Sequence, residues 1–275
     1  DLLKTINDSL SGSKSLESLI LFNRSEKKLK LSHCPKSLKV YDWKTLLKQN
    51  AGQTEKAQAF DSEQALFTLF TSGSTGTPKG LVHTTAGYLL QASLSLKTVF
   101  GTCENDLFWT TADYGWITGH SYGLYGPLSL GLTTLMYEGG IGTPNWARLW
   151  QMIETYQVTQ FYTAPTAIRA CMKNGKNLPK DYDLSSLKVI GSVGEPINEE
   201  AWQWYKKEIG REQCPLVDTW WQTETGSIML CPVPKIKQTK QGSQGQPLAG
   251  IKLRIDSPTT TGDGKIKKGE LVIES

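Results

Sequence analysis

The 275-residue sequence has little that would assign it to a membrane, secreted or histidine-based class of protein. No apolar run approaches the ~18 residues of a membrane-spanning helix, and the first residues lack the basic-then-apolar order of a signal peptide. There are only 3 histidines, His33, His83 and His120, and their spacing gives little support to a catalytic triad or a metal site. We expect no membrane partner.

Disulfide and zinc frameworks are also not indicated. The 5 cysteines are odd in number, stand far apart and include no C-x-x-C pair. They are typical of free thiols in a reducing compartment, so we expect a cytoplasmic protein. The net charge of +4 is small, and its lysines are dispersed. Dispersed charge favours solvated surfaces over a nucleic-acid groove, and we expect no nucleic-acid partner.

The chain does have the alternating pattern of an α/β fold. Strands are predicted at 65–70, 107–112, 132–137, 159–163, 187–193 and 214–220. Helices are predicted between them, at about 86–99, 121–130, 146–157, 165–173 and 198–209. Such repeated β-α units indicate a mainly parallel sheet with helices on both faces. Residues 1–230 are predicted to form this α/β core, and 231–275 to begin a small antiparallel β subdomain.

Unusual residue clusters follow several of the predicted strands. They occupy 71–80, 111–122, 163–165, 191–196 and 218–226. Because parallel strands bind ligands at their carboxyl ends, we expect these five segments to converge on one site.

The first cluster has the chemistry of a phosphate-binding loop. Residues 71–80 read T-S-G-S-T-G-T-P-K-G, so hydroxyls, glycines and one lysine present many donors over a short distance. The order is not that of a Walker A loop, because Lys79 is followed by Gly80 and not by serine or threonine. A flexible Gly/Ser linker is the alternative, but a linker has no need of a fixed lysine.

This loop resembles the signature T-S-G-S-T-G-x-P-K-G of the adenylate-forming enzymes, which include acyl-CoA synthetases and luciferases. Residues 111–122 are similar to the acetyl-CoA synthetase segment T-A-D-x-G-W-x-T-G-H-S-Y, so the resemblance is to that family in particular. The resemblance implies that these residues form part of the large N-terminal domain of those enzymes. His120 could equally be a hydrogen-bonded structural histidine.

The resemblance also implies roles for individual residues. Nucleotide contacts would come from Thr71, Ser72, Gly73, Ser74, Thr75, Gly76, Lys79, Gly194, Glu195, Pro196, Asp218, Thr219, Trp220, Trp221, Gln222 and Thr223. The acetate pocket would be formed by Ile117, Thr118, Val193 and Trp221, and coenzyme A would contact Thr118, Asn145 and Ala164. Catalytic roles would fall to Thr71, Lys79 and Glu224, with Glu224 as the Mg²⁺ ligand.

The implied activity is ATP-dependent activation of acetate to acetyl-AMP, followed by thioester formation with coenzyme A. A propionate or other short-chain ligase stays open as an alternative, and so does a nucleotide-binding fragment without ligase activity. The family's ribose-binding aspartate and mobile C-terminal lid domain have no counterpart in these residues. We therefore expect a central fragment with little or no turnover of its own, and the sequence leaves its oligomeric state open.

Overall fold

The computed structural model describes residues 2–24, 30–32, 34–72, 76–233, 240–260, 264 and 267–274. The chain forms two compact units, residues 1–59 and 60–275. No helix in the described part of the chain combines the length and the apolar character that crossing a membrane requires.

The first unit is a small α/β arrangement. It contains α1 (Leu2–Gly12), β1 (Ser18–Leu21), β2 (Lys39–Asp42) and α2 (Trp43–Gln49). The two strands pair in parallel. Asp42 begins α2, because its carboxylate accepts a hydrogen bond from the backbone N–H of Thr45 at 2.8 Å.

The second unit is built on a five-stranded parallel sheet with the order β6-β5-β7-β8-β9. The strands are β5 (Leu107–Thr110), β6 (Thr133–Leu135), β7 (Gln160–Thr163), β8 (Val189–Ser192) and β9 (Leu216–Asp218). All four pairings are parallel. The predicted α/β class with a mainly parallel sheet is therefore confirmed.

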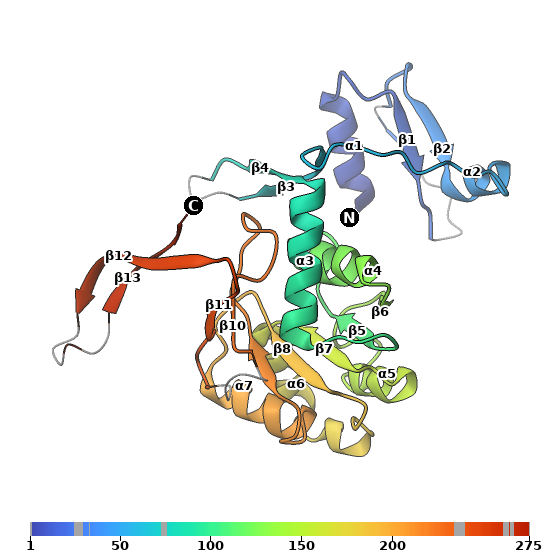
Figure 1. Cartoon of the computed structure of the whole chain (residues 1–275). Coiled ribbons are helices and arrows are strands. Elements are labelled where there is room, and N and C mark those ends of the chain that lie inside the picture. Colours follow the sequence, from blue (N-terminus) through green and yellow to red (C-terminus); the bar gives the residue numbers. More distant parts are fainter. Residues whose placement is uncertain are drawn as a thin grey trace. The chain divides into compact units, whose positions relative to one another are not determined.

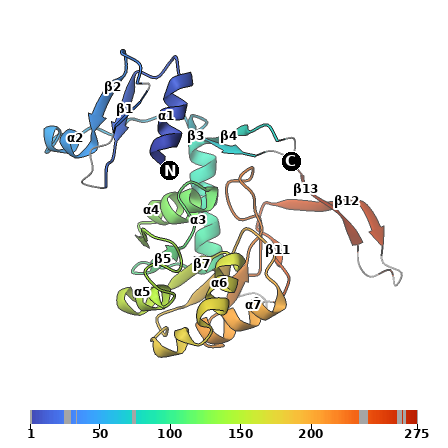
Figure 2. The same ribbon diagram turned by 180° about the vertical axis from the view of Figure 1, so that it is seen from behind.

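Helices cover both faces of this sheet (Figures 1 and 2). They are α3 (Thr85–Phe100), η1 (Gly119–Tyr125), α4 (Gly126–Ser129), α5 (Arg148–Tyr156), α6 (Pro165–Gly175), η2 (Leu178–Asp181), α7 (Glu199–Trp204) and η3 (Tyr205–Ile209). Neighbouring strand residues point to opposite faces: Trp109 and Phe161 pack with α5, α6 and α7, whereas Phe108 and Tyr162 pack with α3 and η1. Two-sided burial makes this sheet a rigid base.

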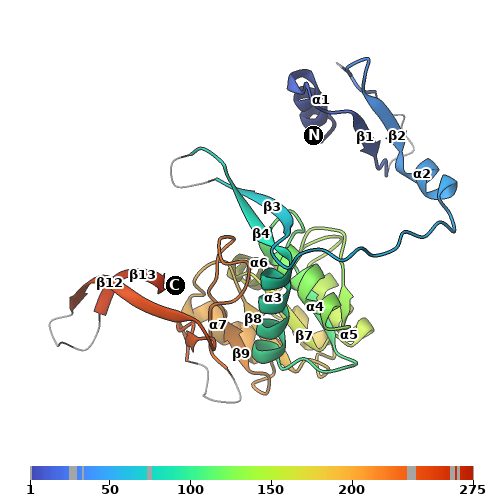
Figure 3. The same cartoon turned by 45° about the horizontal axis from the view of Figure 1, so that its top comes forward.

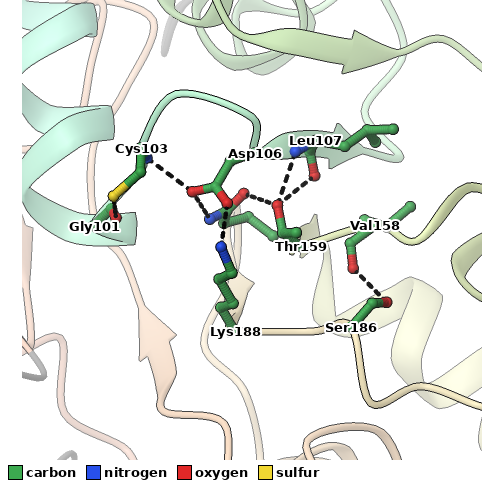
Figure 4. A network of polar contacts seen from close by, with 9 residues as sticks. Gly101, Cys103, Asp106, Leu107, Val158, Thr159, Ser186 and Lys188 are labelled. Atoms are coloured by element: carbon green, nitrogen blue, oxygen red, sulfur yellow. Dashed lines mark hydrogen bonds and ion pairs between the residues drawn. The ribbon is translucent and has the colours of Figure 1, made fainter.

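A polar network fixes the amino ends of three of these strands (Figure 4). The carboxylate of Asp106, 1% exposed, accepts from Lys188 Nζ at 2.6 Å, from Gln160 Nε2 at 2.8 Å and from the backbone N–H of Cys103 at 2.8 Å. Burial alone would raise the pKa of Asp106, but these hydrogen bonds outweigh burial and lower it. The network ties β5, β7 and β8 together at the edge opposite their carboxyl ends.

The strand predicted at 65–70 is present, but it does not belong to the parallel sheet as predicted. β3 (Ala65–Thr71) pairs antiparallel with β4 (Lys79–Thr84) in a separate two-stranded sheet, and its residues are either exposed or half-buried. Figure 3 shows this hairpin leading into α3. Only residues 72–78 join the strands, which is too short for a parallel crossover of a dozen or more residues. Four of the five predicted clusters, and not all five, therefore follow strands of the parallel sheet.

The C-terminal part consists of short antiparallel pairs. β10 (Leu230–Cys231) pairs with β11 (Gln246–Pro247), and β12 (Lys252–Thr260) pairs with β13 (Lys267–Glu274). The antiparallel character predicted for this tail is confirmed. The predicted domain boundary at residue 230 stays a prediction.

Candidate functional site

A cavity of about 490 Å³ lies at the carboxyl ends of the parallel strands. This volume is typical of a pocket for a small molecule. Its lining comes from four segments that are far apart in the sequence: 110–118, 163–167, 193–194 and 221–223, with Ile141 in addition. The segments meet because β5, β7, β8 and β9 are adjacent and parallel, so their carboxyl ends lie at the same edge.

This cavity brings together eight of the residues predicted from the sequence. They are Ile117, Thr118, Ala164, Val193, Gly194, Trp221, Gln222 and Thr223. All four residues of the predicted acetate pocket are among them. The side chains of Ile117, Val193 and Trp221 are buried, each less than 10% exposed. Together they form an apolar wall beside hydroxyl and amide groups, a combination suited to a short acyl group attached to a polar ligand.

Two buried tyrosines hold the indole of Trp221. Its Nε1–H donates to the hydroxyl of Tyr162 at 3.1 Å, and its ring makes an edge contact with Tyr122, with ring centroids 5.2 Å apart. Burial raises the pKa of both tyrosines far above the ordinary value, so their hydroxyls stay protonated and can donate. The Trp221 side chain therefore has a defined position in the cavity wall.

The carboxylate of Asp218, predicted to contact the nucleotide, is turned into the protein. The residue is 2% exposed and accepts from Ser192 Oγ at 2.6 Å and from Gln244 Nε2 at 3.2 Å. Burial raises the pKa of Asp218 to about 6, although both hydrogen bonds act in the opposite direction. Asp218, Thr219 and Trp220 do not line the cavity.

Glu195 is likewise engaged by the protein. Its carboxylate accepts from the backbone N–H of Thr166 at 2.7 Å and from the Arg169 guanidinium at 2.8 Å. Burial would raise the pKa of Glu195, but the hydrogen bonds from Thr166 and Arg169 outweigh it and the pKa is lowered. The carboxylate thus caps the start of α6 and joins it to the 193–196 turn. Gly194, at φ +95°, faces open space, where a Cβ would meet nothing within 4 Å.

The predicted phosphate loop lies at the turn of the β3–β4 hairpin. Thr71 and Lys79 are paired across the hairpin, and Lys79 is exposed. Thr71, Ser72, Gly76 and Lys79 do not line the cavity, and Gly73, Ser74 and Thr75 lie outside the described residues. The hairpin nevertheless contacts the site, because His83 Nε2 donates to the carbonyl oxygen of Thr223 at 2.8 Å.

Three other predicted residues lie outside the cavity lining, namely Asn145, Pro196 and Glu224. Asn145 uses its side-chain oxygen locally, accepting from the backbone N–H of Ala147 at 3.0 Å. Nothing in the sequence distinguishes such a local turn contact from a ligand contact. The role of Asn145 stays a prediction.

The surroundings of Glu224 bear on its predicted role as a magnesium ligand. Among the described residues, no group of three or more His, Cys, Asp or Glu side chains could hold a metal ion, and Glu224 itself is exposed. Mg²⁺ is commonly held by one or two carboxylates together with substrate phosphates and water. A single exposed carboxylate next to the cavity-lining Thr223 fits that mode, in which the nucleotide would supply the other oxygens.

The cavity also includes residues that were not predicted individually. They are Thr110, Thr111, Ala112, Asp113, Trp116, Ile141, Thr163, Thr166 and Ala167. The clusters at 111–122 and 163–165 pointed to several of these positions without assigning them roles. No sequence pattern pointed to Ile141. It lies in a loop, and only the folded structure brings it to the cavity.

Fold and site together define an α/β ligand-binding protein. The family of AMP-binding enzymes matches residues 9–275, and the chain belongs to that family. This match confirms the predicted membership of the adenylate-forming superfamily.

Among curated relatives, the chain is similar to acetyl-coenzyme A synthetases. It is 54% identical over 209 residues to that of Deinococcus radiodurans, covering 76% of this chain and 32% of the relative. It is 58% identical over 195 residues to that of Methylobacillus flagellatus, covering 71% of this chain and 30% of the relative. It is 50% identical over 232 residues to that of Chlorobaculum tepidum, covering 84% of this chain and 35% of the relative. The chain thus spans about a third of the length of these relatives.

Proposed function

We propose that this chain supplies the acyl-adenylate pocket of an acetate–CoA ligase. The observation that carries the proposal is the meeting of Ile117, Thr118, Val193 and Trp221 in one cavity, next to the predicted nucleotide residues Gly194, Gln222 and Thr223. The similarity to acetyl-coenzyme A synthetases supports acetate as the acid. The substrates would be acetate, ATP and coenzyme A.

In the proposed first step, an acetate oxygen attacks the α-phosphorus of ATP, the α–β anhydride bond breaks, and pyrophosphate leaves. The chain's part is to bring two anions together. Ile117, Val193 and Trp221 would hold the acetate methyl group, and Thr71 and Lys79 would donate to the phosphates. Mg²⁺, held by Glu224 and the nucleotide, would add charge neutralisation.

In the proposed second step, the coenzyme A thiol gives up its proton to water and attacks the acetyl carbon, a C–S bond forms, and AMP leaves with the electrons of the broken C–O bond. Thr118 and Ala164 line the same cavity as the acyl-pocket residues, and the thiol would approach along them. Neither step needs a covalent bond to the protein. The cytoplasmic location inferred from the cysteines and the low turnover expected of this chain alone both stay predictions.

The size of the acyl pocket separates acetate from longer acids. An indole at the wall leaves room for two or three carbons, so longer acyl groups should be excluded by overlap. We expect acetyl-sulfamoyladenosine, a non-reactive mimic of acetyl-AMP, to raise the melting temperature of this chain. The shift should decline through the propionyl and butyryl analogues and should be smaller for ATP alone.

The stabilisation follows mass action, at about 2.7 kcal/mol for a ligand at a hundred times its dissociation constant. Equal shifts for all three acyl groups would contradict an acetate pocket and favour a ligase for longer acids. Absence of any shift, with the chain shown to be folded by its circular dichroism, would contradict the adenylate pocket itself.

A further inference from the structure

The Trp221 indole is the first member of a buried chain of hydrogen bonds. Its Nε1–H donates to Tyr162 Oη at 3.1 Å, Tyr162 Oη lies 2.6 Å from Thr219 Oγ1, and Thr219 Oγ1 lies 2.9 Å from the carbonyl oxygen of Ser192. All four residues are buried, each less than 10% exposed. These hydrogen bonds run across β7, β8 and Thr219, the residue after β9.

The direction of every bond is fixed by chemistry. An indole N–H can only donate and a carbonyl oxygen can only accept. The Thr219 hydroxyl therefore gives its proton to Ser192, and the Tyr162 hydroxyl gives its proton to Thr219. Tyr162 then accepts from Trp221. Each group is satisfied in one arrangement, and fully satisfied buried networks hold side chains in place.

This series of hydrogen bonds connects two residues of the predicted acyl pocket. Trp221 lines the cavity itself, and the last acceptor, Ser192, directly precedes Val193, which also lines it. The backbone of Val193 is held as well, because its N–H donates to the carbonyl oxygen of Thr163 at 3.1 Å. Without the Tyr162 hydroxyl, the indole would keep its edge contact with Tyr122 but lose the bond that fixes its tilt.

We infer that Tyr162 and Thr219 are specificity-determining residues that act through Trp221: their hydroxyls fix the indole so that the pocket accepts two carbons and rejects four. Neither residue lines the cavity, so neither touches the acyl group. They are positioning residues. The inference rests on the proposed function, since it assigns the length selectivity of that same pocket.

The test compares dissociation constants of acetyl- and butyryl-sulfamoyladenosine, measured by calorimetry on this chain and its variants. Tyr162→Phe removes one hydroxyl and should lower the butyryl-to-acetyl ratio of dissociation constants by about fivefold, as expected for one hydrogen bond. Tyr205→Phe is the matched control. Tyr205 is equally buried, but its hydroxyl donates to the carbonyl oxygens of Phe161 and Gly191 and has no link to Trp221.

A second pair of variants keeps the test decisive if Tyr162→Phe does not fold. Thr219→Val removes the hydroxyl at nearly constant shape and should lower the ratio, whereas Thr219→Ser keeps the hydroxyl and should leave it unchanged. A ratio equal to wild type in Tyr162→Phe and Thr219→Val, or a ratio lowered as much in Tyr205→Phe, would overturn the inference. If wild type itself binds neither mimic, or binds both equally, the proposed function fails instead.

Discussion

Asp218 is a carboxylic acid held almost entirely inside the protein, at the end of β9. It has a serine hydroxyl and a glutamine amide as partners, and no cation is paired with it among its described contacts. Burial of the charged form without a counter-ion raises its pKa to about 6, against 3.8 for the exposed group. The folded state therefore binds this proton more tightly than the unfolded state does.

The sign of the pH effect follows from that difference. A raised pKa contributes stability that is fully present below about pH 4 and is lost as the pH rises through about 6. Relative to Asp218→Asn, wild type should lose up to about 3 kcal/mol of unfolding free energy between pH 4 and pH 7. Urea unfolding at several pH values measures this difference. A pH profile of Asp218→Asn that runs parallel to that of wild type would contradict the assignment.

Positions in the cavity lining could be predicted from sequence where a side chain meets the cavity directly. Trp221 and Val193 are two such positions, and their roles stay predictions. Glu195 and Asp218 carry the same family signal, yet their carboxylates bond to Arg169 and Ser192, partners distant in sequence. Long-range hydrogen bonds leave no local pattern in a sequence, so the Tyr162–Thr219 chain could not be predicted either.

Among the elements, the parallel strands were predictable because most are short runs of apolar or β-branched residues between turn residues. The β3–β4 hairpin was not predicted. The predicted loop ran over 71–80 and no strand was predicted at 81–84, so only the short 72–78 connection signals that the chain turns back antiparallel. The four remaining clusters still converge, because the carboxyl ends of adjacent parallel strands share one edge.

The sheet in turn depends on the Asp106 network at its opposite edge. Asp106→Ala removes the shared acceptor of three donors and leaves the buried Gln160 amide without it, so we expect a loss of about 3 kcal/mol of unfolding free energy. Lys188→Met should cost less, because two donors stay on the carboxylate. Urea unfolding measures both. A larger loss for Lys188→Met than for Asp106→Ala would show that the carboxylate is not the centre of the network.

At the scale of the whole molecule, the chain contains a cavity typical of ligand pockets but spans about a third of the length of its curated relatives. The cavity is contained in the second unit, residues 60–275, and all its lining residues come from 110–223. Binding of a mimic can therefore be tested on this chain directly, without reference to turnover.

The central claim is that this cavity is a short-chain acyl-adenylate pocket with Trp221 as its size limit. The most direct measurement is the dissociation constants of acetyl- and butyryl-sulfamoyladenosine for wild type and Trp221→Ala, with Trp221→Leu as an intermediate in case the alanine variant loses too much core packing. Wild type should prefer the acetyl mimic, Trp221→Leu should discriminate less, and Trp221→Ala should prefer the butyryl mimic by about tenfold, since the butyryl group buries two more methylenes where the indole stood. An unchanged preference for the acetyl mimic in both folded variants would contradict the claim.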